Sequence, residues 1–448
     1  MRRDLLGAAT AGLTMMASGT LVWSGAAAAE EVPLTPRQVF FRDPDRTVPR
    51  LSPDGRNLAW LEPHDGALNL VMAAVEDVSH PRRLTHVTGR SLSTYFNWAF
   101  TNKHLVFFRD EAGDENYRPF SVAIDTGEVL PLLPAGGRSF LQQRARRTPN
   151  EMLFGHNARD HSFFDLIRID VTTGEARPLF QNPGFAKLYT MADFSVRFGS
   201  RFRRDGSAEV MLWESDGQWG NFLDIPPEDA LTTRLDAISD DGRFAFVIDS
   251  RGRDTAALIE TDIATRETRV LAEDPEADIV SGVYDPGSGR PFAAYSVAAR
   301  QRWHPIDPAW AFDLDHIKAA EGEGDVAFST ISGEWSKVVL SYSRSDASTE
   351  FRIYDRRKQA FTPLFKARTD LDGLALRPMR QRGAPVTYVA FSDEGHGFVR
   401  QENRLAFNAV AEMFLAQHLG GRAEPVGKAF AGSTIEFQAG RELVMGAG

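Results

Sequence analysis

Turn sequences recur along this chain at a spacing that suits one class of β architecture. From about residue 40 to residue 370, short runs rich in Val, Ile, Phe, Tyr and Leu alternate with Asp-Gly, Asn and Pro turns, without long helical periodicity. The mean step is about 45 to 50 residues, the length of one four-stranded propeller blade. The turns are Ser52–Arg56, Thr101–Lys103, Thr148–Glu151, Arg204–Gly206, Ser239–Arg243, Asp285–Gly287 and Ser332–Glu334.

A second repeated feature closes several of these units. An acidic turn joins two strand-like runs at Asp125–Glu128, Asp170–Glu175 and Asp262–Thr265, and Asp and Gly accept the dihedrals of a hairpin. The two repeats together predict a mostly β protein, a β-propeller of about seven four-stranded blades. Six or eight blades also fit the spacing, and a row of sandwich domains or a solenoid is the alternative.

The pattern changes after Phe365. The run 386–391 has the composition of a strand, 402–419 has the spacing of an amphipathic helix, and 434–437 is a further strand candidate. Gly420 and Gly421 supply the helix stop. The apolar face expected on this helix consists of Phe407, Val410, Ala411, Phe414 and Leu415.

The loop between that strand and that helix carries the most specific motif. Residues 383–398 read Gly-Ala-Pro-Val-Thr-Tyr-Val-Ala-Phe-Ser-Asp-Glu-Gly-His-Gly-Phe. With the blade array, this resembles the prolyl oligopeptidase family of serine peptidases, in particular its bacterial dipeptidyl and acylaminoacyl peptidase-like members. Segments 113–118, 157–160 and 182–184 are similar to blade motifs of that family. The resemblance implies a seven-bladed propeller, an α/β-hydrolase domain and a catalytic base at His396.

A histidine base needs a serine and an orienting carboxylate before it in the chain. No Gly-x-Ser-x-Gly elbow occurs in the sequence, and Ser288, Ser336 and Ser433 have the context of turn or strand residues. Between Phe365 and His396 there is room for about one βα unit. We therefore expect an internal loss that leaves a truncated hydrolase remnant at 371–448, an orphaned His396 and no peptidase activity of the chain alone.

Three functions remain open on these grounds. The propeller, assigned to residues 30–370, could bind a peptide or protein; a partner chain could complete an active serine exopeptidase; or the propeller could be a periplasmic scaffold. Charged residues at Asp114, Glu115 and Arg118 could hold a peptide terminus in the tunnel, but a turn paired with itself is expected. Asp393, Glu394 and His396 share one short loop without a second ligand cluster, so we expect no metal site and no cofactor.

The chain begins with the features of an export signal. Met1-Arg2-Arg3 precedes an apolar, Ala-rich stretch, and cleavage after Ala29 gives a periplasmic or secreted protein by the twin-arginine or the general secretory route. No later segment is apolar enough to span a bilayer.

A net charge of −10 disfavours nucleic acid as a partner, and the absence of cysteine excludes disulfides. Self-association through the remnant helix is the other contact expected.

Overall fold

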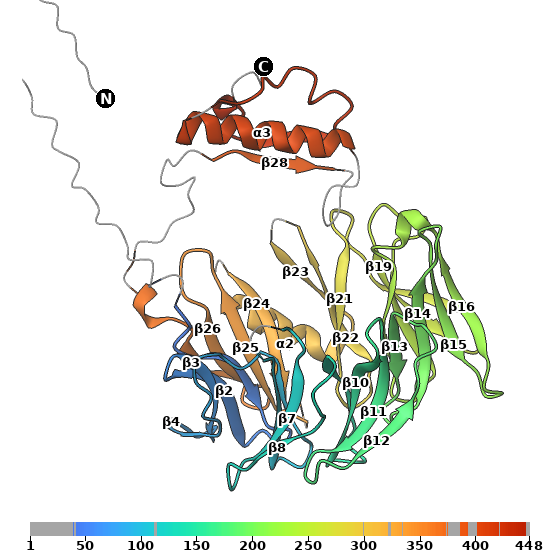
Figure 1. Cartoon of the computed structure of the whole chain (residues 1–448), viewed down its shortest axis with the longest axis vertical. Coiled ribbons are helices and arrows are strands. Elements are labelled where there is room, and N and C mark those ends of the chain that lie inside the picture. Colours follow the sequence, from blue (N-terminus) through green and yellow to red (C-terminus); the bar gives the residue numbers. More distant parts are fainter. Residues whose placement is uncertain are drawn as a thin grey trace, which may run out of the picture. The chain divides into compact units, whose positions relative to one another are not determined.

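The computed structural model describes residues 39, 42–111, 114–298, 300–320, 324–333, 335–372, 374, 386–392, 401–420 and 422–444. Within them, the chain forms seven antiparallel sheets in sequence order, followed by a two-stranded sheet. Figure 1 shows the seven sheets following one another from blue to orange. The fold is therefore the predicted seven-bladed β-propeller.

Each blade is built from consecutive strands. Blade one contains β1 (Thr47–Leu51), β2 (Asn57–His64), β3 (Ala67–Ala74) and β4 (Asp77–Arg83). Blade two contains β5 (Phe96–Trp98), β6 (His104–Arg109), β7 (Arg118–Ala123) and β8 (Val129–Pro131). Blade three contains β9 (Ser139–Arg144), β10 (Glu151–Asp160), β11 (Phe163–Asp170) and β12 (Ala176–Phe180). Blade four contains β13 (Lys187–Thr190), β14 (Val196–Phe202), β15 (Ala208–Trp213) and β16 (Trp219–Ile225).

The remaining blades follow the same plan with one exception. A short 3-10 helix, η1 (Pro227–Asp229), leads into blade five, which contains β17 (Arg234–Ile238), β18 (Phe244–Asp249), β19 (Ala257–Asp262) and β20 (Thr268–Ala272). Blade six contains β21 (Ile279–Tyr284), β22 (Pro291–Val297) and β23 (Gln301–Pro305). Blade seven contains β24 (Asp325–Ile331), β25 (Lys337–Ser343), β26 (Glu350–Asp355) and β27 (Ala360–Lys366), and η2 (Thr369–Leu371) follows it.

The repeated turns occupy equivalent places in the blades. Six of the seven predicted turns join the first strand of a blade to the second, whereas Arg204–Gly206 joins β14 to β15, the second and third strands of blade four. The acidic turns at 125–128, 170–175 and 262–265 join third strands to fourth strands, as the sequence predicted. We call the end of the ring where first strands begin the start face, and the opposite end, where the first turns lie, the turn face.

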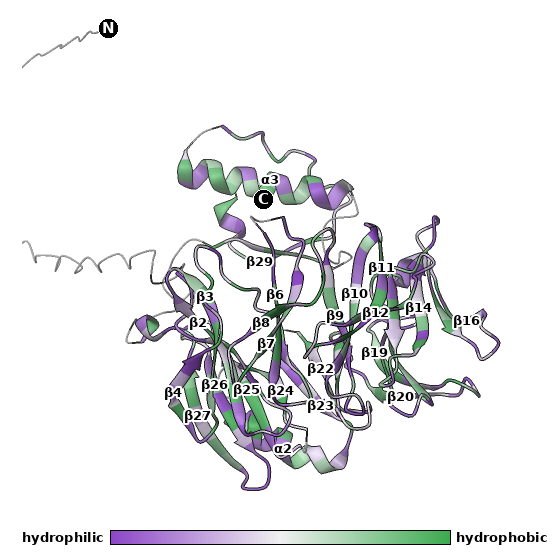
Figure 2. Ribbon diagram, turned by 60° about the horizontal axis from the view of Figure 1, so that its bottom comes forward, coloured by the Kyte–Doolittle hydropathy of each residue, from purple (hydrophilic) through white to green (hydrophobic). Residues whose placement is uncertain are grey.

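Large aromatic side chains on the second strands fill the space between blades. The strands β2, β6, β10, β14, β18 and β22 each place at least one such ring in the core, at no more than 2% exposure. Removing a ring of this size from water contributes roughly 1.5 to 3 kcal/mol. Figure 2 shows hydrophobic colour on the blade strands, for example β25. The six side chains are Trp60, Phe107, Phe154, Phe198, Phe246 and Phe292.

The ring closes where blade one meets blade seven. The backbone N–H of Leu51 donates to Thr330 Oγ1 at 3.0 Å, and Ser329 Oγ donates to the carbonyl of Pro49 at 2.8 Å. Lys337 Nζ donates to the carbonyl of Gly55 at 3.2 Å. Among the described residues the two sheets share no strand, so side chains and turn backbone hold this junction.

Blade six contains a helix that corrects the expectation of an unbroken β pattern. Helix α2 (Pro308–Ala319) follows β23, and the side chain of Asp307 caps it by accepting from Ala309 N. Trp310 stacks on Phe292 with ring centroids 4.0 Å apart. An N-cap Asp followed by Pro at the first helical position is a recognised start signal.

The C-terminal segment folds on its own small core. Strand β28 (Tyr388–Phe391) pairs antiparallel with β29 (Ile435–Ala439), and helix α3 (Gln401–Leu419) lies between them in sequence; η4 (Arg441–Leu443) follows. The predicted strands and helix are present, but the predicted face of the helix is wrong in part. Val410 is buried, whereas Phe407 and Leu415 are exposed.

The helix buries a different stripe because the tail covers it. Ala406, Val410 and Met413 pack with Val426 and Val444, and the fully buried Asn403 accepts from Ser433 Oγ at 2.8 Å and Thr434 N at 3.0 Å. No described helix has both the length and the apolarity needed to cross a membrane.

Candidate functional site

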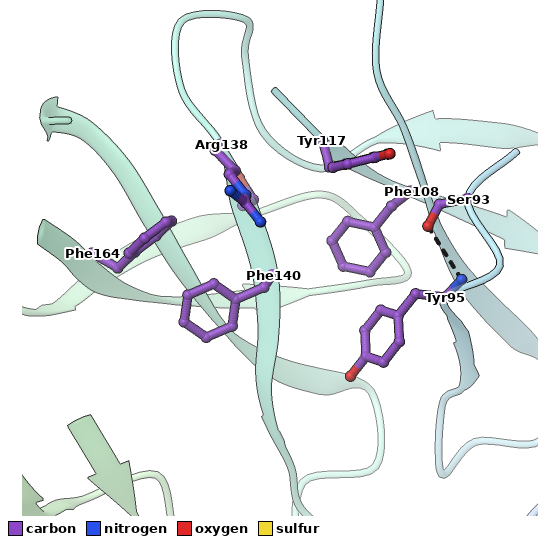
Figure 3. Close-up of a pocket in the computed structure, with 8 residues that line it drawn as sticks. Ser93, Tyr95, Phe108, Tyr117, Arg138, Phe140 and Phe164 are labelled. Carbon is purple, nitrogen blue, oxygen red and sulfur yellow. Dashed lines mark hydrogen bonds between the residues drawn. The ribbon is translucent and has the colours of Figure 1, made fainter. Parts of the chain in front are cut away.

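An aromatic pocket of about 350 Å³ opens between blades two and three. Its lining comes from the ends of strands, which lets side chains project from a rigid scaffold. Figure 3 shows Tyr95 and Phe108 on one side, Phe140 and Phe164 on the other, and Arg138 above them. The lining residues are Ser93, Tyr95, Phe108, Tyr117, Arg138, Ser139, Phe140 and Phe164.

The pocket lies on the start face of the propeller. Tyr95 immediately precedes β5, Ser139 begins β9, and Phe164 stands near the beginning of β11. The chain also enters and leaves the propeller on this face, since Asp45 N donates to the carbonyl of Ala367 at 2.7 Å. Any segment joined to the propeller therefore starts from the face that carries the pocket.

Two ring pairs form the pocket walls. The rings of Tyr95 and Phe108 are tilted with centroids 5.6 Å apart, and those of Phe140 and Phe164 meet edge to face at 4.9 Å. Phe140 lies against Gly155 on the neighbouring strand, where a Cβ atom would collide with its ring. Phe140 is 37% exposed, which leaves apolar surface available to a ligand.

Two of the sequence motifs hold the pocket walls in place. Asn157 Oδ1 accepts from the N–H of Arg138 at 2.7 Å. Asn182 Nδ2 donates to the carbonyl of Phe164 at 3.1 Å, and the carboxylate of Asp165 accepts from Asn182 N at 2.8 Å. Segments 157–160 and 182–184, far apart in sequence, thus meet behind one site.

An ion pair joins these two motifs. Arg159 donates to both oxygens of Asp165, at 2.6 and 2.8 Å, and also to the carbonyl of Asn182 at 3.2 Å. These hydrogen bonds, led by that from Arg159, lower the pKa of Asp165 and keep it ionised. A bidentate arginine fixes the angle between the strands that carry it.

The third motif borders the pocket through Tyr117. The carbonyl of Tyr117 accepts from Ser139 N at 2.9 Å. Arg118 pairs with Glu111, and Asp114 accepts from the N–H groups of Glu111 and Asn116 at 3.1 and 3.0 Å. Arg118 and Asp114 therefore bond within their own turn, as expected for a self-paired charged loop.

A serine and a histidine meet at the pocket floor. Ser139 Oγ lies 2.8 Å from Nδ1 of His156, and both residues are buried. Burial lowers the pKa of His156, so the imidazole is neutral near pH 7. A hydroxyl next to a neutral imidazole is the beginning of a nucleophile–base pair. In the described residues, no carboxylate within ion-pair distance orients the ring.

Blade six brings Ser296, His304 and Asp274 together in a different order from a catalytic triad. Ser296 Oγ donates to Asp274 Oδ2 at 2.6 Å and lies 2.9 Å from His304 Nε2. In a triad the carboxylate binds the histidine, and the histidine binds the serine. Here the carboxylate accepts the hydrogen bond of the serine hydroxyl directly, while His304 Nε2 lies 3.6 Å from Asp274 Oδ2, and Ser296 is fully buried. This cluster is structural.

The predicted site residues have mixed outcomes. His396, Asp393 and Glu394 lie outside the described residues. Ser288 and Ser336 stand in turns of the propeller, and Ser433 binds Asn403. The aromatic residues Trp98, Phe107, Phe108 and Phe120 of blade two are buried, whereas Phe100 is only half-buried and lines the central channel.

The described residues contain no group of three or more carboxylates and imidazoles arranged to hold a metal ion.

The aromatic pocket was missed by sequence reasoning. Tyr95, Phe140 and Phe164 have the composition of ordinary strand residues, and only the three-dimensional meeting of the motifs identifies them.

Comparison with known proteins agrees with this propeller. The chain is 33% identical over 352 residues to dipeptidyl aminopeptidase BIII of Pseudoxanthomonas mexicana, covering 77% of this chain and 50% of that protein. It is 21% identical over 343 residues to dipeptidyl peptidase family member 6 of Caenorhabditis elegans, covering 72% of this chain and 46% of that protein. The chain thus spans about half the length of the curated relatives it matches.

A solved structure from a structural and mechanistic study of two prolyl endopeptidases has a similar fold. It aligns with a TM-score of 0.50 and 10% identity, over 73% of this chain and 50% of that one. This likeness concerns the fold alone. No family model matches the chain.

Proposed function

We propose, on the premise that this chain belongs to the prolyl oligopeptidase family of serine peptidases, that its propeller binds peptides at the start-face pocket and that the chain alone is catalytically incomplete. The observation that carries the proposal is the convergence of three family-like motifs on one aromatic pocket. The two relatives it matches are named as a dipeptidyl aminopeptidase and a dipeptidyl peptidase family member, so a peptide is the ligand class that fits them.

The chemistry of the pocket suits a peptide with an apolar side chain. Tyr95, Phe108, Phe140 and Phe164 offer ring faces and edges that an aliphatic or aromatic group can contact. Arg138 is exposed and forms no ion pair among the described residues, so its guanidinium is available to a peptide carbonyl or carboxylate. Apolar walls with one cationic donor fix both the side chain and the direction of a peptide.

Two observations support catalytic incompleteness: the sequence lacks a nucleophile motif, and the buried Ser139 does not replace it. The chain has no Gly-x-Ser-x-Gly elbow. The Ser139–His156 pair is buried within the propeller, and a functioning hydrolase also needs an orienting acid and oxyanion donors. An active enzyme formed with a partner chain is the alternative.

Peptide binding should depend on the pocket rings. We expect Phe140→Ala to weaken binding of a fluorescently labelled peptide rich in Phe and Leu by about tenfold or more, because it removes roughly 1.5 to 3 kcal/mol of apolar contact. Fluorescence anisotropy measures this. The matched control is Phe202→Ala, which removes an exposed ring at the end of β14. Equal affinity of Phe140→Ala and wild type would reject the pocket as the binding site.

The purified chain should not react as a serine hydrolase. We expect no labelling by a fluorophosphonate probe and no hydrolysis of dipeptidyl or aminoacyl chromogenic substrates, with Ser139→Ala and His396→Ala indistinguishable from wild type. In-gel fluorescence and absorbance assays measure both. Labelling that disappears in Ser139→Ala, or hydrolysis that disappears in His396→Ala, would contradict catalytic incompleteness.

A further inference from the structure

The turn face of the propeller carries a second, polar cavity at the end of the central channel. It has a volume of about 530 Å³ and continues into a constriction of about 30 Å³, with which it shares Phe100, Arg144, Arg146 and Pro286. All seven blades contribute to this lining. The cavity and its constriction therefore form the mouth of the channel on the face opposite the aromatic pocket.

Arginines gather on one side of this mouth. Arg50 from blade one lies at the constriction, and Arg144, Arg146 and Arg147 from blade three line the main cavity. Phe100 packs against two of them, with the guanidinium carbons of Arg144 and Arg146 at 5.2 and 5.1 Å from the centre of its ring. The ring holds these two guanidinium groups in position but carries no net charge, so it does not neutralise them.

The hydrogen bonds of these arginines leave most donors unused. Arg144 donates to the carbonyl of Trp98 at 2.8 Å, and Arg146 donates to the carbonyl of Gly333 at 3.1 Å. In the described part of the chain, Nε of Arg50 is buried without a hydrogen-bond partner. Each guanidinium has five N–H donors, so several can bind a ligand.

The cluster also lacks direct ion-pair partners. Among the described residues, no carboxylate lies within 4 Å of Arg50, Arg144, Arg146 or Arg147, although the chain carries a net charge of −10. Many other arginines of the propeller are paired with carboxylates, as Arg159 is with Asp165. Burial, then the neighbouring charge of Arg50, lowers the pKa of Arg144 to about 10. An anion would relieve this repulsion.

Three carboxylates line the other side of the cavity, and none forms an ion pair with the arginines: Asp240 lies beyond ion-pair distance, and burial raises its pKa. The other two are bonded elsewhere. Asp193 accepts from Ser195 Oγ at 2.6 Å, and Asp241 accepts from Ser239 Oγ and Arg243 N at 2.5 and 3.0 Å. These bonds engage both groups in their own turns. They also place negative charge opposite the arginines, which favours a ligand with its anionic group at one end over a uniformly acidic one.

We propose that the arginine cluster Arg50, Arg144 and Arg146 binds a carboxylate at the turn-face mouth of the channel. The planar fork of arginine matches a carboxylate, and the volume of the cavity exceeds what an inorganic ion fills. The ligand class is the carboxylate end of a peptide or of a small organic acid. This site opens on the face opposite the start-face pocket, although the guanidinium of Arg50 lies 5.9 Å from the ring centre of Tyr95, and it does not depend on the proposed function.

The test uses the whole chain and a pair of probes that differ in one group. Isothermal titration compares a short Gly/Ala peptide bearing a free C-terminal carboxylate with the same peptide as an amide, and with acetate. We expect the free acid to bind at least about tenfold more tightly than the amide. Binding of acetate with an affinity close to that of the free acid assigns the site to small organic acids.

Variants locate the binding. Arg146→Gln removes an exposed guanidinium and should weaken binding of the free acid about tenfold, and Arg144→Lys, which keeps the charge but loses the fork, should weaken it as well. Arg204→Gln in the turn between β14 and β15 makes the same charge change elsewhere and should bind like wild type. Phe140→Ala should leave this binding intact. Equal binding of acid and amide, or wild-type affinity in Arg146→Gln, would overturn the proposal.

Discussion

Replacing Asp313 by Ala should destabilise the propeller by about 3 to 5 kcal/mol, the usual consequence of removing one partner from a buried ion pair. Asp313 is 6% exposed on α2 and accepts from Tyr354 Oη at 2.8 Å and from Arg356 Nε and Nη2 at 2.9 and 2.7 Å. The substitution leaves the donors of Tyr354 and Arg356 without this acceptor. The guanidinium of Arg356 is held in place over the ring of Trp310, 3.7 Å from its centre. Urea unfolding followed by tryptophan fluorescence measures the loss.

The same helix offers the control. Asp315 is exposed two residues later, so Asp315→Ala changes the same chemistry in the same helix and should shift the unfolding free energy by less than about 0.5 kcal/mol. If Asp313→Ala unfolds at the same urea concentration as Asp315→Ala, the helix is not anchored to blade seven through this carboxylate.

Replacing Asn182 by Ala is the second large effect, because this one side chain makes four hydrogen bonds. Its Nδ2 donates to the carbonyls of Phe164 and Phe185 at 3.1 and 2.9 Å, and its Oδ1 accepts from the N–H groups of Gly184 and Phe185 at 3.0 and 2.7 Å. At about 0.5 to 1.5 kcal/mol each, their loss should cost about 2 to 4 kcal/mol. Thermal unfolding by circular dichroism measures the change.

Two further variants separate stability from binding. Asn182→Asp retains the two accepted bonds and loses the two donated ones, so its stability should fall between that of wild type and that of Asn182→Ala. Asn221→Ala, at an exposed position of β16, should be close to neutral. Peptide affinity should fall in Asn182→Ala, since Phe164 forms a pocket wall. Wild-type stability in Asn182→Ala would show that the motif does not brace blade three.

The propeller fold could be predicted from the sequence because the turn residues that identify it lie close together along the chain. The Asp-Gly and Asn turns fix where strands end, and six of the seven join the first strand of a blade to the second, so their spacing indicated about seven blades. The strand at 388–391 and the helix at 401–419 were accessible for the same reason.

The features that sequence reasoning missed depend on tertiary packing. Helix α2 replaces the expected fourth strand of blade six because Trp310 packs on Phe292, a contact across the blade. Its local start signal at Asp307-Pro308 was nevertheless available. The buried side of α3 was predicted incorrectly because it is set by the tail from Val426 onward, which packs against the helix and cannot be placed from local sequence. Phe140 can form a pocket wall because Gly155, on the neighbouring strand, has no side chain and leaves room for its ring.

The junction between the first and last blades has a mechanical consequence. Neighbouring strands within a blade are joined by ladders of backbone hydrogen bonds, whereas blade one is linked to blade seven by single hydrogen bonds, such as those of Leu51, Ser329 and Lys337, and by a shared apolar core. Such bonds contribute about 0.5 to 1.5 kcal/mol each. Closure of the ring therefore depends mainly on the shared apolar core of the two blades, in which Leu51 and Trp60 pack with Val339, so a cavity made in that core should weaken this junction while leaving the ladders of every sheet intact.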